Sequence, residues 1–206
     1  MKPGIAFFDF DGTITKKDTL LEFIKFTNGS FKFALGFLIN SPWLIAYKLR
    51  VISNQKAKER ILKFFFGGME ASLFNDHCQK FFDQKIPQLI RQKSIIEINR
   101  LAAEDVEVVI VSASPENWVR LWAEKINADC LSTRLRIDNN RISGYILGKN
   151  CYGDEKVKRI KEKYSLSEYD QIYAYGDSKG DKQMLDLAKV KFYKPFRGNP
   201  EHSEPD

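Results

Sequence analysis

A short apolar stretch that runs into two aspartates constrains the fold of this chain more than any other feature. Residues 5–8 are all apolar, and they are followed directly by Asp9-Phe10-Asp11-Gly12-Thr13. An apolar run this short that ends at a turn signal is typical of a strand buried on both faces, as in a parallel sheet. Asp9 and Asp11 would then lie at the carboxyl end of the strand, where open α/β sheets bind their ligands.

The two aspartates are two residues apart, so both carboxylates face one space if the extended geometry continues beyond the strand. Like charges held this close are unfavourable unless a cation or a shared proton compensates them. Because Asp-Gly is also an ordinary turn dipeptide, this segment alone leaves open a strand that simply ends in a turn.

Further strands are predicted for the same sheet at residues 106–114, 128–131, 171–176 and 191–194. The first of these ends at Ser112 and Ser114, and the third runs into Asp177 and Asp181. Because the predicted strands alternate with helical segments, they indicate an α/β fold whose parallel strands bring these polar ends to one edge.

Three local features belong to this part of the chain. Ser114 is expected to cap the next helix, with Pro115 as its first residue. Residues 133–146 have the pattern of a β-hairpin that turns at Asn139-Asn140. Lys156 lies near the start of a predicted basic helix.

Residues 18–93 have helical patterns and no convincing strand. The first helix begins with a capping-box sequence in which Thr19 is followed by Glu22, and further helices are predicted at residues 55–66, 70–82 and 86–102. We therefore predict a discontinuous core of residues 1–17 and 94–206 that is interrupted by a helical insertion of residues 18–93. Residues 196–206 are expected to form a loose tail.

Within this insertion, residues 31–39 and 43–47 form two apolar pieces that are separated by Asn40-Ser41-Pro42. Each would be roughly 14 Å long as a helix, whereas the hydrocarbon core of a bilayer is about 30 Å thick, so neither spans it. A helical hairpin buried inside the insertion is the expected structure. The alternative is contact with an anionic lipid or membrane surface. The cations close to Phe and Trp would support it: Lys25, Lys32, Lys48, Arg50, Lys56 and Lys58.

The polar residues at the strand ends suit phosphoryl transfer through an aspartyl-phosphate. Unit charges about 4 Å apart interact by about 4 kcal/mol at an effective dielectric of 20, so clustered carboxylates need a divalent cation before they can receive a phosphate dianion. Mg²⁺ prefers such oxygen ligands, and Asp9, Asp177 and the backbone carbonyl of Asp11 are inferred to hold it. Lys156 would neutralise the phosphoryl oxygens and Ser112 would hydrogen-bond them. The Asp11 side chain is left as general acid and base.

These residues resemble the four motifs of the haloacid dehalogenase-like superfamily, and the resemblance covers nearly the whole chain. The motifs are Asp9-Phe-Asp-Gly-Thr13, Ser112, Lys156 and Gly176-Asp-Ser-x-x-Asp181. The likeness implies a Rossmann-like three-layer α/β/α core with a mainly parallel sheet, plus an inserted all-helical cap of the C1 type. It implies Asp9 as nucleophile and metal ligand, Asp11 as acid/base, and Asp177 as the other metal ligand.

The same resemblance assigns supporting roles at the site. Asp181 and Ser178 would position the metal ligands, and residues of the first two motifs would surround the substrate phosphate: Gly12, Thr13, Ala113 and Ser114. An aspartate at position 11 is typical of the phosphatases of the superfamily and is missing from its dehalogenases, so a Mg²⁺-dependent phosphatase is predicted.

The substrate is less constrained. The chain resembles subfamily IB and its phosphoserine-phosphatase-like branch, in which Asp18 would face a substrate amino group and Arg60 a substrate carboxylate. Asp18 is equally explained as an acid at a helix start, whereas a place on a solvated helix face is the favoured interpretation of Arg60. Ser112-Ala-Ser-Pro115 and Gly180 depart from that branch and resemble phosphatidylglycerophosphatase C-like proteins, which makes a lipid phosphomonoester the alternative to a small phosphorylated substrate.

Two other function classes remain open at this point. One is a phospho-acceptor signalling domain, against which the large cap argues. The other is a non-catalytic membrane or scaffold protein, which only the apolar residues 31–52 favour.

Charge and cysteine content narrow the partners and the location. The net charge of +6 favours anionic ligands, but the lysines are scattered, so no nucleic-acid partner is expected. The odd number of cysteines, without metal-ligand spacing, indicates a reducing cytoplasm. Because residues 1–3 lead straight into the strand, no signal peptide is expected. Peripheral attachment to the inner face of a membrane is the alternative location.

Overall fold

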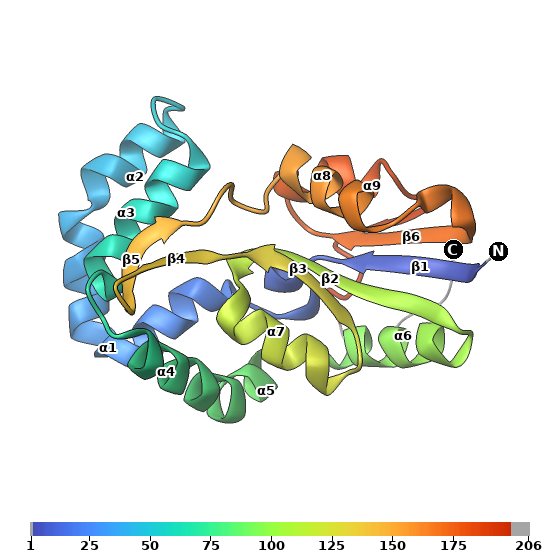
Figure 1. The fold of residues 1–206 in the computed structure, drawn as a ribbon, viewed down its shortest axis with the longest axis horizontal. Helices are drawn as coiled ribbons and strands as arrows, with labels where there is room; N and C mark the ends of the chain where they lie inside the picture. Colours follow the sequence, from blue (N-terminus) through green and yellow to red (C-terminus); the bar gives the residue numbers. More distant parts are fainter. Residues whose placement is uncertain (1, 199–206) are drawn as a thin grey trace.

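The structure, a computed structural model that describes residues 2–198, has a central sheet with helices on both of its faces (Figure 1). The strands of this sheet are β1 (Lys2–Phe8), β2 (Val106–Pro115), β3 (Asp129–Thr133), β6 (Tyr169–Gly176) and β7 (Val190–Tyr193). They lie in the order β3-β2-β1-β6-β7, and every neighbouring pair is parallel. The prediction of an α/β fold with a mainly parallel sheet is confirmed.

The central strand β1 is buried on both faces, as its apolar sequence predicts. Ala6 and Phe8 pack into one hydrophobic cluster, and Ile5 and Phe7 pack into a second. This alternation follows from the geometry of a strand, in which successive side chains point to opposite faces. The first cluster includes side chains of α6 (Gln92–Ala103) and α7 (Glu116–Lys125), and the second includes side chains of α8 (Asp154–Lys163) and α9 (Lys182–Leu185). The core therefore has three layers (Figure 1).

The segment between β1 and β2 is helical, with α1 (Thr19–Ile39), α2 (Ser41–Lys48), α3 (Asn54–Phe66), α4 (Ala71–Gln84), α5 (Ile86–Leu89) and α6. The single helix predicted at residues 86–102 is wrong, because Ile90 lies between α5 and α6 in an isolated antiparallel bridge with Thr15. The capping box predicted at Thr19 is also wrong. Asp18 is the N-cap of α1, and its Oδ1 accepts a hydrogen bond of 3.0 Å from the amide of Leu21.

The predicted hairpin is present as β4 (Leu135–Asp138) and β5 (Arg141–Ile146), and it turns at Asn139 and Asn140 with φ of 48° and 60°. Asparagine tolerates this left-handed conformation. The hairpin lies beside the inserted helices (Figure 1). One contact between them is the hydrogen bond of 2.8 Å from the amide of Ile142 to the carbonyl of Met69. The division into residues 1–17 with 94–206 and residues 18–93 stays a proposal, to which we add that β4 and β5 pack with the insertion.

The apolar segment at residues 31–52 forms the second half of α1, the whole of α2 and the start of the following loop. Its prediction as a buried hairpin is wrong for most of its length. Phe31 is 83% exposed and Leu38 is 69% exposed, and no residue of α2 is fully buried. Among residues 2–198, we find no helix with the length and hydrophobicity that a membrane crossing needs.

The predicted loose tail at residues 196–206 is wrong at its first residue. Phe196 is buried, and its ring stacks on Tyr175 with a centroid distance of 5.7 Å. Arg197 follows it and reaches the end of the sheet where β1 and β6 terminate. Residues 199–206 lie outside the described residues.

Candidate active site

The candidate site lies where the chain changes direction across the sheet. From β1 the chain passes to β2 and β3 on one side, and it later returns to β6 on the other side of β1. Ligands of open α/β sheets bind at such a switch point, outside the carboxyl ends of the strands. A pocket of about 420 Å³ opens there, and its lining includes Asp9, Asp11, Lys156, Asp177 and Asp181. This volume suits a small ligand.

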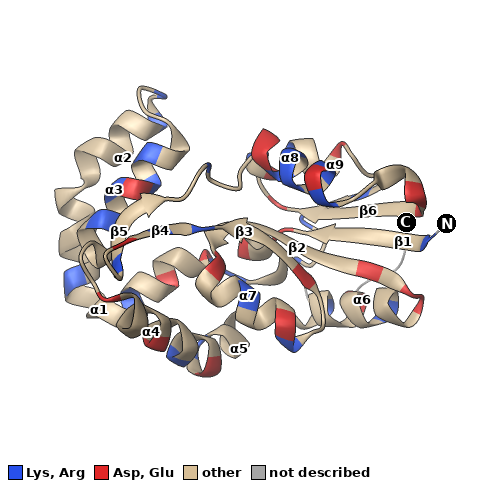
Figure 2. Cartoon of the chain, viewed as in Figure 1, with Lys and Arg blue, Asp and Glu red and all other residues tan. Residues whose placement is uncertain are grey.

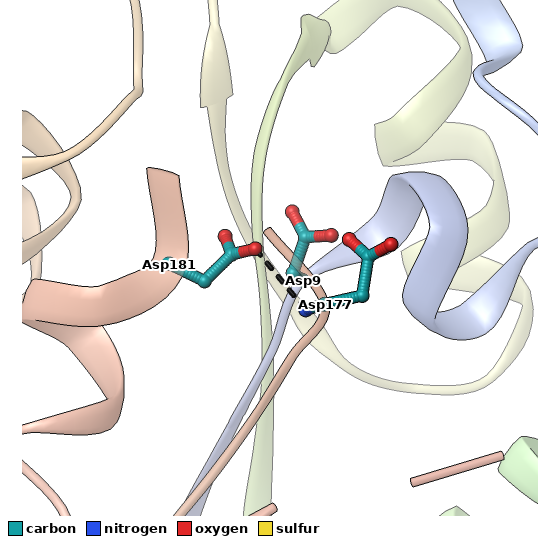
Figure 3. Close-up of side chains that lie close together, drawn as sticks. All are labelled: Asp9, Asp177 and Asp181. Atoms are coloured by element: carbon teal, nitrogen blue, oxygen red, sulfur yellow. Dashed lines mark hydrogen bonds between the residues drawn. The ribbon is translucent and has the colours of Figure 1, made fainter. Parts of the chain in front are cut away.

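Three carboxylates from two ends of the chain converge in this pocket (Figure 3). Asp9, Asp177 and Asp181 each place a carboxylate oxygen so that the three atoms lie within 4.8 Å of one another. Asp9 follows β1 directly, and its amide donates to the carbonyl of Tyr175 in β6 at 2.9 Å. This hydrogen bond joins the end of β1 to the strand that leads into Asp177.

Lys156 supplies the positive charge in the middle of this cluster. From the first turn of α8, its Nζ donates to Asp9 Oδ1 and Asp181 Oδ1, both at 2.6 Å, and to the carbonyl of Val111 at 2.7 Å. Burial alone would lower the pKa of Lys156, but the charges of Asp9 and Asp181 outweigh burial and hold this pKa above its usual range. The ammonium therefore stays charged.

The loop after β6 is organised by Asp181. Its Oδ2 accepts hydrogen bonds from the amides of Asp177 and Ser178 at 3.2 and 3.0 Å, and from the Ser178 hydroxyl at 2.7 Å. Burial raises the pKa of Asp181, but Lys156 more than compensates and holds it below its usual value. Asp181 thus holds both the loop that carries Asp177 and the ammonium of Lys156.

Asp177 is half-buried and has a cationic neighbour that the sequence does not indicate. Its Oδ2 accepts a hydrogen bond of 2.6 Å from a guanidinium nitrogen of Arg197. Burial, followed by the charge of Asp181, raises the pKa of the Asp177 carboxyl, and Arg197 opposes this shift. Arg197 lies in the segment predicted as a loose tail, so no motif could have identified it.

Asp11 is held between α1 and the end of β2. Its Oδ1 accepts from the amide and the hydroxyl of Thr19, both at 2.6 Å. Its Oδ2 accepts from Ser114 Oγ at 2.6 Å and from Ser112 Oγ at 3.4 Å. The Trp118 indole donates to the same Thr19 hydroxyl at 2.9 Å. The start of the first inserted helix is therefore tied directly to the Asp11 carboxylate.

Ser112 and Ser114 differ in how they lie relative to the pocket. Ser112 is completely buried and does not line the pocket, whereas Ala113 and Ser114 do. The expectation that Ser114 caps α7 is wrong, because Pro115 is the N-cap and the Ser114 hydroxyl is used by Asp11. Thr13 is buried, and its hydroxyl donates to Asp9 Oδ2 at 3.2 Å.

Arg60, predicted to reach the substrate, points elsewhere. It is exposed, its Nε donates to Asn40 Oδ1 at 3.1 Å, and its guanidinium lies 5.3 Å from the ring centre of Trp43. Lys58, two residues earlier in α3, lines the pocket instead, and its Nζ donates to the carbonyl of Ala113 at 2.9 Å. Burial lowers the pKa of Lys58, although Asp18 and Asp11 oppose the shift. The prediction for Arg60 is wrong because α3 faces the pocket in a different register.

The position of Asp18 agrees with both interpretations that the sequence left open, a helix cap and a residue that faces the substrate. It caps α1 through Leu21, and it also lines the pocket near Lys58. Asp18 is exposed as a residue, but partial burial of its carboxyl group in the pocket wall, followed by the charge of Asp11, raises the pKa of Asp18 to about 6.

Two glycines permit the close approaches at this site. A Cβ on Gly12, whose φ is 78°, would lie 2.4 Å from Asp177 Oδ2. A Cβ on Gly180 would lie 2.2 Å from a ring carbon of Tyr152, which also lines the pocket. At Gly180, where the chain departs from the phosphoserine-phosphatase pattern, the Tyr152 ring occupies the space of a side chain.

The donor set suits a small divalent cation. All of the clustered ligand atoms are carboxylate oxygens, and they come from residues held by backbone and Lys156 contacts. Hard oxygen ligands of this kind are those that Mg²⁺ prefers.

Comparison with known proteins gives a consistent picture. A sequence model of haloacid dehalogenase-like hydrolases matches residues 6–186. Protein CicA of Caulobacter vibrioides is 36% identical over 201 residues, which cover 97% of this chain and 89% of that protein. A probable phosphatase of Mycobacterium tuberculosis is 27% identical over 207 residues, with 94% of this chain and 69% of that protein covered.

Solved structures share the fold. A protein of unknown function from Bordetella pertussis has a TM-score of 0.82 at 18% identity, with 94% of this chain and 90% of that chain covered. A phospho-aspartyl intermediate analogue of a phosphoserine phosphatase has a TM-score of 0.68 at 14% identity, with 94% and 87% covered. At these identities the structures establish the fold alone.

Proposed function

The chain belongs to the haloacid dehalogenase-like hydrolase family, and we propose that it hydrolyses phosphomonoesters through a covalent phosphate on Asp9. The observation that carries this proposal is the convergence of Asp9, Asp177 and Asp181 around Lys156 in one pocket, with Asp11 beside it. A turn that merely happens to be rich in aspartate would not bring these residues together.

In the first step, a carboxylate oxygen of Asp9 bonds to the phosphorus, and the bond from phosphorus to the alcohol oxygen breaks. Asp11 gives its proton to the departing alkoxide. In the second step, Asp11 takes a proton from a water molecule that attacks the phosphorus, and the acyl-phosphate bond to Asp9 breaks. The products are the free alcohol and inorganic phosphate, and both aspartates return to their starting states.

The other residues stabilise charge and hold positions. Lys156 stays charged and lies against Asp9, so it offsets negative charge that develops on the transferred group. Thr19 and Ser114 hold both oxygens of Asp11. We propose that Asp9, Asp177 and the Asp11 backbone carbonyl hold Mg²⁺, which when bound would polarise the phosphoryl oxygens and screen the carboxylates from the substrate.

For the substrate, we propose a small phosphorylated metabolite that carries both an amino group and a carboxylate, such as phosphoserine. Asp18 and Lys58 line the same pocket and present opposite charges. In this arrangement Asp18 faces the amino group, and Lys58 takes the part that the resemblance suggested for Arg60.

A lipid phosphomonoester is the second candidate substrate. One observation favours it: apolar side chains of α1 and α2, in the helical insertion of residues 18–93, are exposed. A lipid would place only its phosphorylated headgroup in the pocket.

A panel of phosphate esters tests the proposal, with phosphoserine, phosphocholine and phosphatidylglycerophosphate supplied with Mg²⁺ or with a chelator. We expect steady phosphate release that the chelator abolishes and that Asp9→Asn reduces to background. Steady turnover would also exclude a phospho-acceptor that only stores phosphate. Turnover that persists in Asp9→Asn would contradict the assigned nucleophile.

Asp18→Asn separates substrate recognition from helix capping. Asparagine is as good an N-cap as aspartate, so α1 keeps its cap while the pocket loses a negative charge. We expect a higher KM for phosphoserine, with much less effect on an ester that has no amino group. An equal loss of kcat for both esters would mean that Asp18 serves the chemical step instead.

A further inference from the structure

The exposed apolar side chains of the described residues are concentrated in one segment. Nine of the nineteen exposed large hydrophobic side chains lie between residues 31 and 51. Scattered single apolar residues on a surface are normal, but a contiguous group marks an interaction site.

The helical spacing places part of this group on one face. Phe31, Leu35, Leu38 and Ile39 follow one another at the intervals of a single helix face, and they are 83%, 43%, 69% and 50% exposed. Another side of the same helix half is used for packing, because Gly36 is buried and a Cβ there would meet the Phe65 ring at 2.2 Å. The outward face therefore lacks a partner within the part of the chain that the structure describes.

The group continues through α2 and the loop after it. Ile45, Leu49 and Val51 are 57%, 69% and 74% exposed. We call the outward side chains of residues 31–51 the apolar surface. It lies on the helical insertion, at the end of the molecule away from both termini (Figure 1).

The charges around the apolar surface have one sign. Between Glu22 and Glu59 the sequence has no acidic residue, and α2 shows no acidic position in Figure 2. Five exposed cations lie in or beside this stretch: Lys25, Lys32, Lys48, Arg50 and Lys56. Within residues 2–198 none of the five forms an ion pair, whereas many other lysines and arginines do.

We propose that the apolar surface binds peripherally to membranes that contain anionic lipid, with its apolar side chains in the headgroup region and the five cations against lipid phosphates. An amphipathic surface with a basic rim has this affinity. A second copy of the chain is disfavoured as the occupant, because face-to-face pairing would bring like charges together.

The apolar surface adjoins the candidate active site. The Tyr47 hydroxyl in α2 accepts a hydrogen bond of 3.2 Å from Asn54, and Asn54 lines the pocket together with Lys58. Membrane binding would therefore hold the pocket close to the lipid headgroups. The binding itself requires no catalysis, so it can be tested separately from the proposed function.

Trp43 is a built-in reporter of this binding. It is 46% exposed, whereas the other two tryptophans, Trp118 and Trp122, are 0% and 4% exposed. Asp9→Asn protein is mixed with phosphatidylcholine vesicles or with vesicles that also contain phosphatidylglycerol. We expect a blue shift of tryptophan emission and co-flotation only with the anionic vesicles, both weakened by high salt.

Matched variants assign the binding to this surface. Each basic residue near an anionic membrane contributes to the free energy of membrane binding. Losing two of them lowers the partition coefficient by about thirtyfold. Lys32→Glu with Lys48→Glu should lose at least this much, whereas Lys80→Glu with Lys161→Glu, equal in charge and outside the surface, should lose far less. Leu38→Ser with Ile45→Ser should also weaken flotation, with Leu73→Ser and Ile96→Ser as the exposed apolar control.

Three results would overturn the proposal. The first is the absence of flotation with anionic vesicles, and the second is flotation that both charge variants weaken equally. The third is a blue shift of Trp43 that depends on protein concentration without lipid and coincides with dimers in sedimentation, which would assign the surface to a second copy of the chain.

Discussion

At Gly12 the backbone passes so close to Asp177 that no side chain fits between them. A Cβ would lie 2.4 Å from Asp177 Oδ2, and the φ of 78° is itself unfavourable for other residues. Gly12→Ala should therefore displace a proposed metal ligand, in addition to a loss of about 1 kcal/mol in stability from backbone strain. Disturbing the positioning of a metal ligand costs about tenfold to a hundredfold in metal affinity or activity. Phosphate release titrated with Mg²⁺ measures the effect.

Gly148 is the matched control for this prediction. Its φ is 79°, but nothing lies within 4 Å of the position of its Cβ. Gly148→Ala should lose similar stability in urea unfolding and keep normal activity. If the two alanine variants are equally active, the close approach at Gly12 has no functional importance.

Lys58 and Arg60 of α3 make a second residue-level prediction. Lys58→Met should raise the KM for a substrate with a second anionic group by roughly tenfold to a hundredfold, since a hydrogen bond to a charged group contributes about 1.5–3 kcal/mol. Arg60→Met should leave KM unchanged, because Arg60 lies against Asn40 and Trp43. Steady-state kinetics on both variants check this, and a larger effect from Arg60→Met would restore the role predicted from the resemblance.

The pH dependence provides a further check on Lys58. Burial lowers the pKa of Lys58, so its charge is lost as the pH rises through a value below the usual 10.4 or so of lysine. The kcat/KM of the unaltered protein should therefore fall on the alkaline side at a lower pH than an exposed lysine would give. The same profile for Lys58→Met should lack this fall, and a fall that persists there would belong to another group.

At the scale of elements, the first turn of α1 supports the chemistry of the end of β1. The Thr19 hydroxyl donates to Asp11 and accepts from Trp118, so one side chain connects α1, α7 and the candidate acid/base. Thr19→Val leaves the Trp118 indole without a partner, which should cost about 1–3 kcal/mol in stability. We also expect kcat to fall, because Asp11 loses one of the contacts that orient it.

Thr27→Val, in the same helix, is the control for Thr19→Val. The Thr27 hydroxyl donates only to carbonyls of α1, at Phe23 and Ile24, and it makes no contact with the site. Thermal unfolding and kcat measured on both variants separate helix stability from site orientation. Equal kcat values in the two variants would show that α1 does not position Asp11.

At the scale of the whole molecule, the end of the described chain closes the core over β6. Phe196 stacks on Tyr175 and lies 6.4 Å from Phe8, between centroids. Phe196→Ala should destabilise the protein by about 3 kcal/mol, the low end for removing a buried phenylalanine. Phe192→Ala should cost less, because Phe192 stacks on the same Tyr175 but is 37% exposed. Urea unfolding of both variants tests this, and equal losses would contradict the structural role of Phe196.

The sequence by itself determined the sheet, the acidic cluster and the family. A short apolar run is typical of a strand buried on both faces of a covered parallel sheet, and the residues that follow such strands meet at one edge. For this reason Asp9, Asp177 and Lys156 could be brought together without coordinates, and the hairpin turn at Asn139-Asn140 could be recognised from its local chemistry.

Tertiary structure alone decided which side chain occupies each contact. Helix register and packing depend on distant partners, so the sequence could not distinguish Lys58 from Arg60 in the pocket, nor assign Thr19 and Ser114 to Asp11 instead of to helix caps. Hydrophobic periodicity shows that a helix face is apolar but not whether another element covers it. The apolar surface of residues 31–51 is exposed because this helix segment packs through its other side chains, whereas Phe196 is buried because it packs against Tyr175.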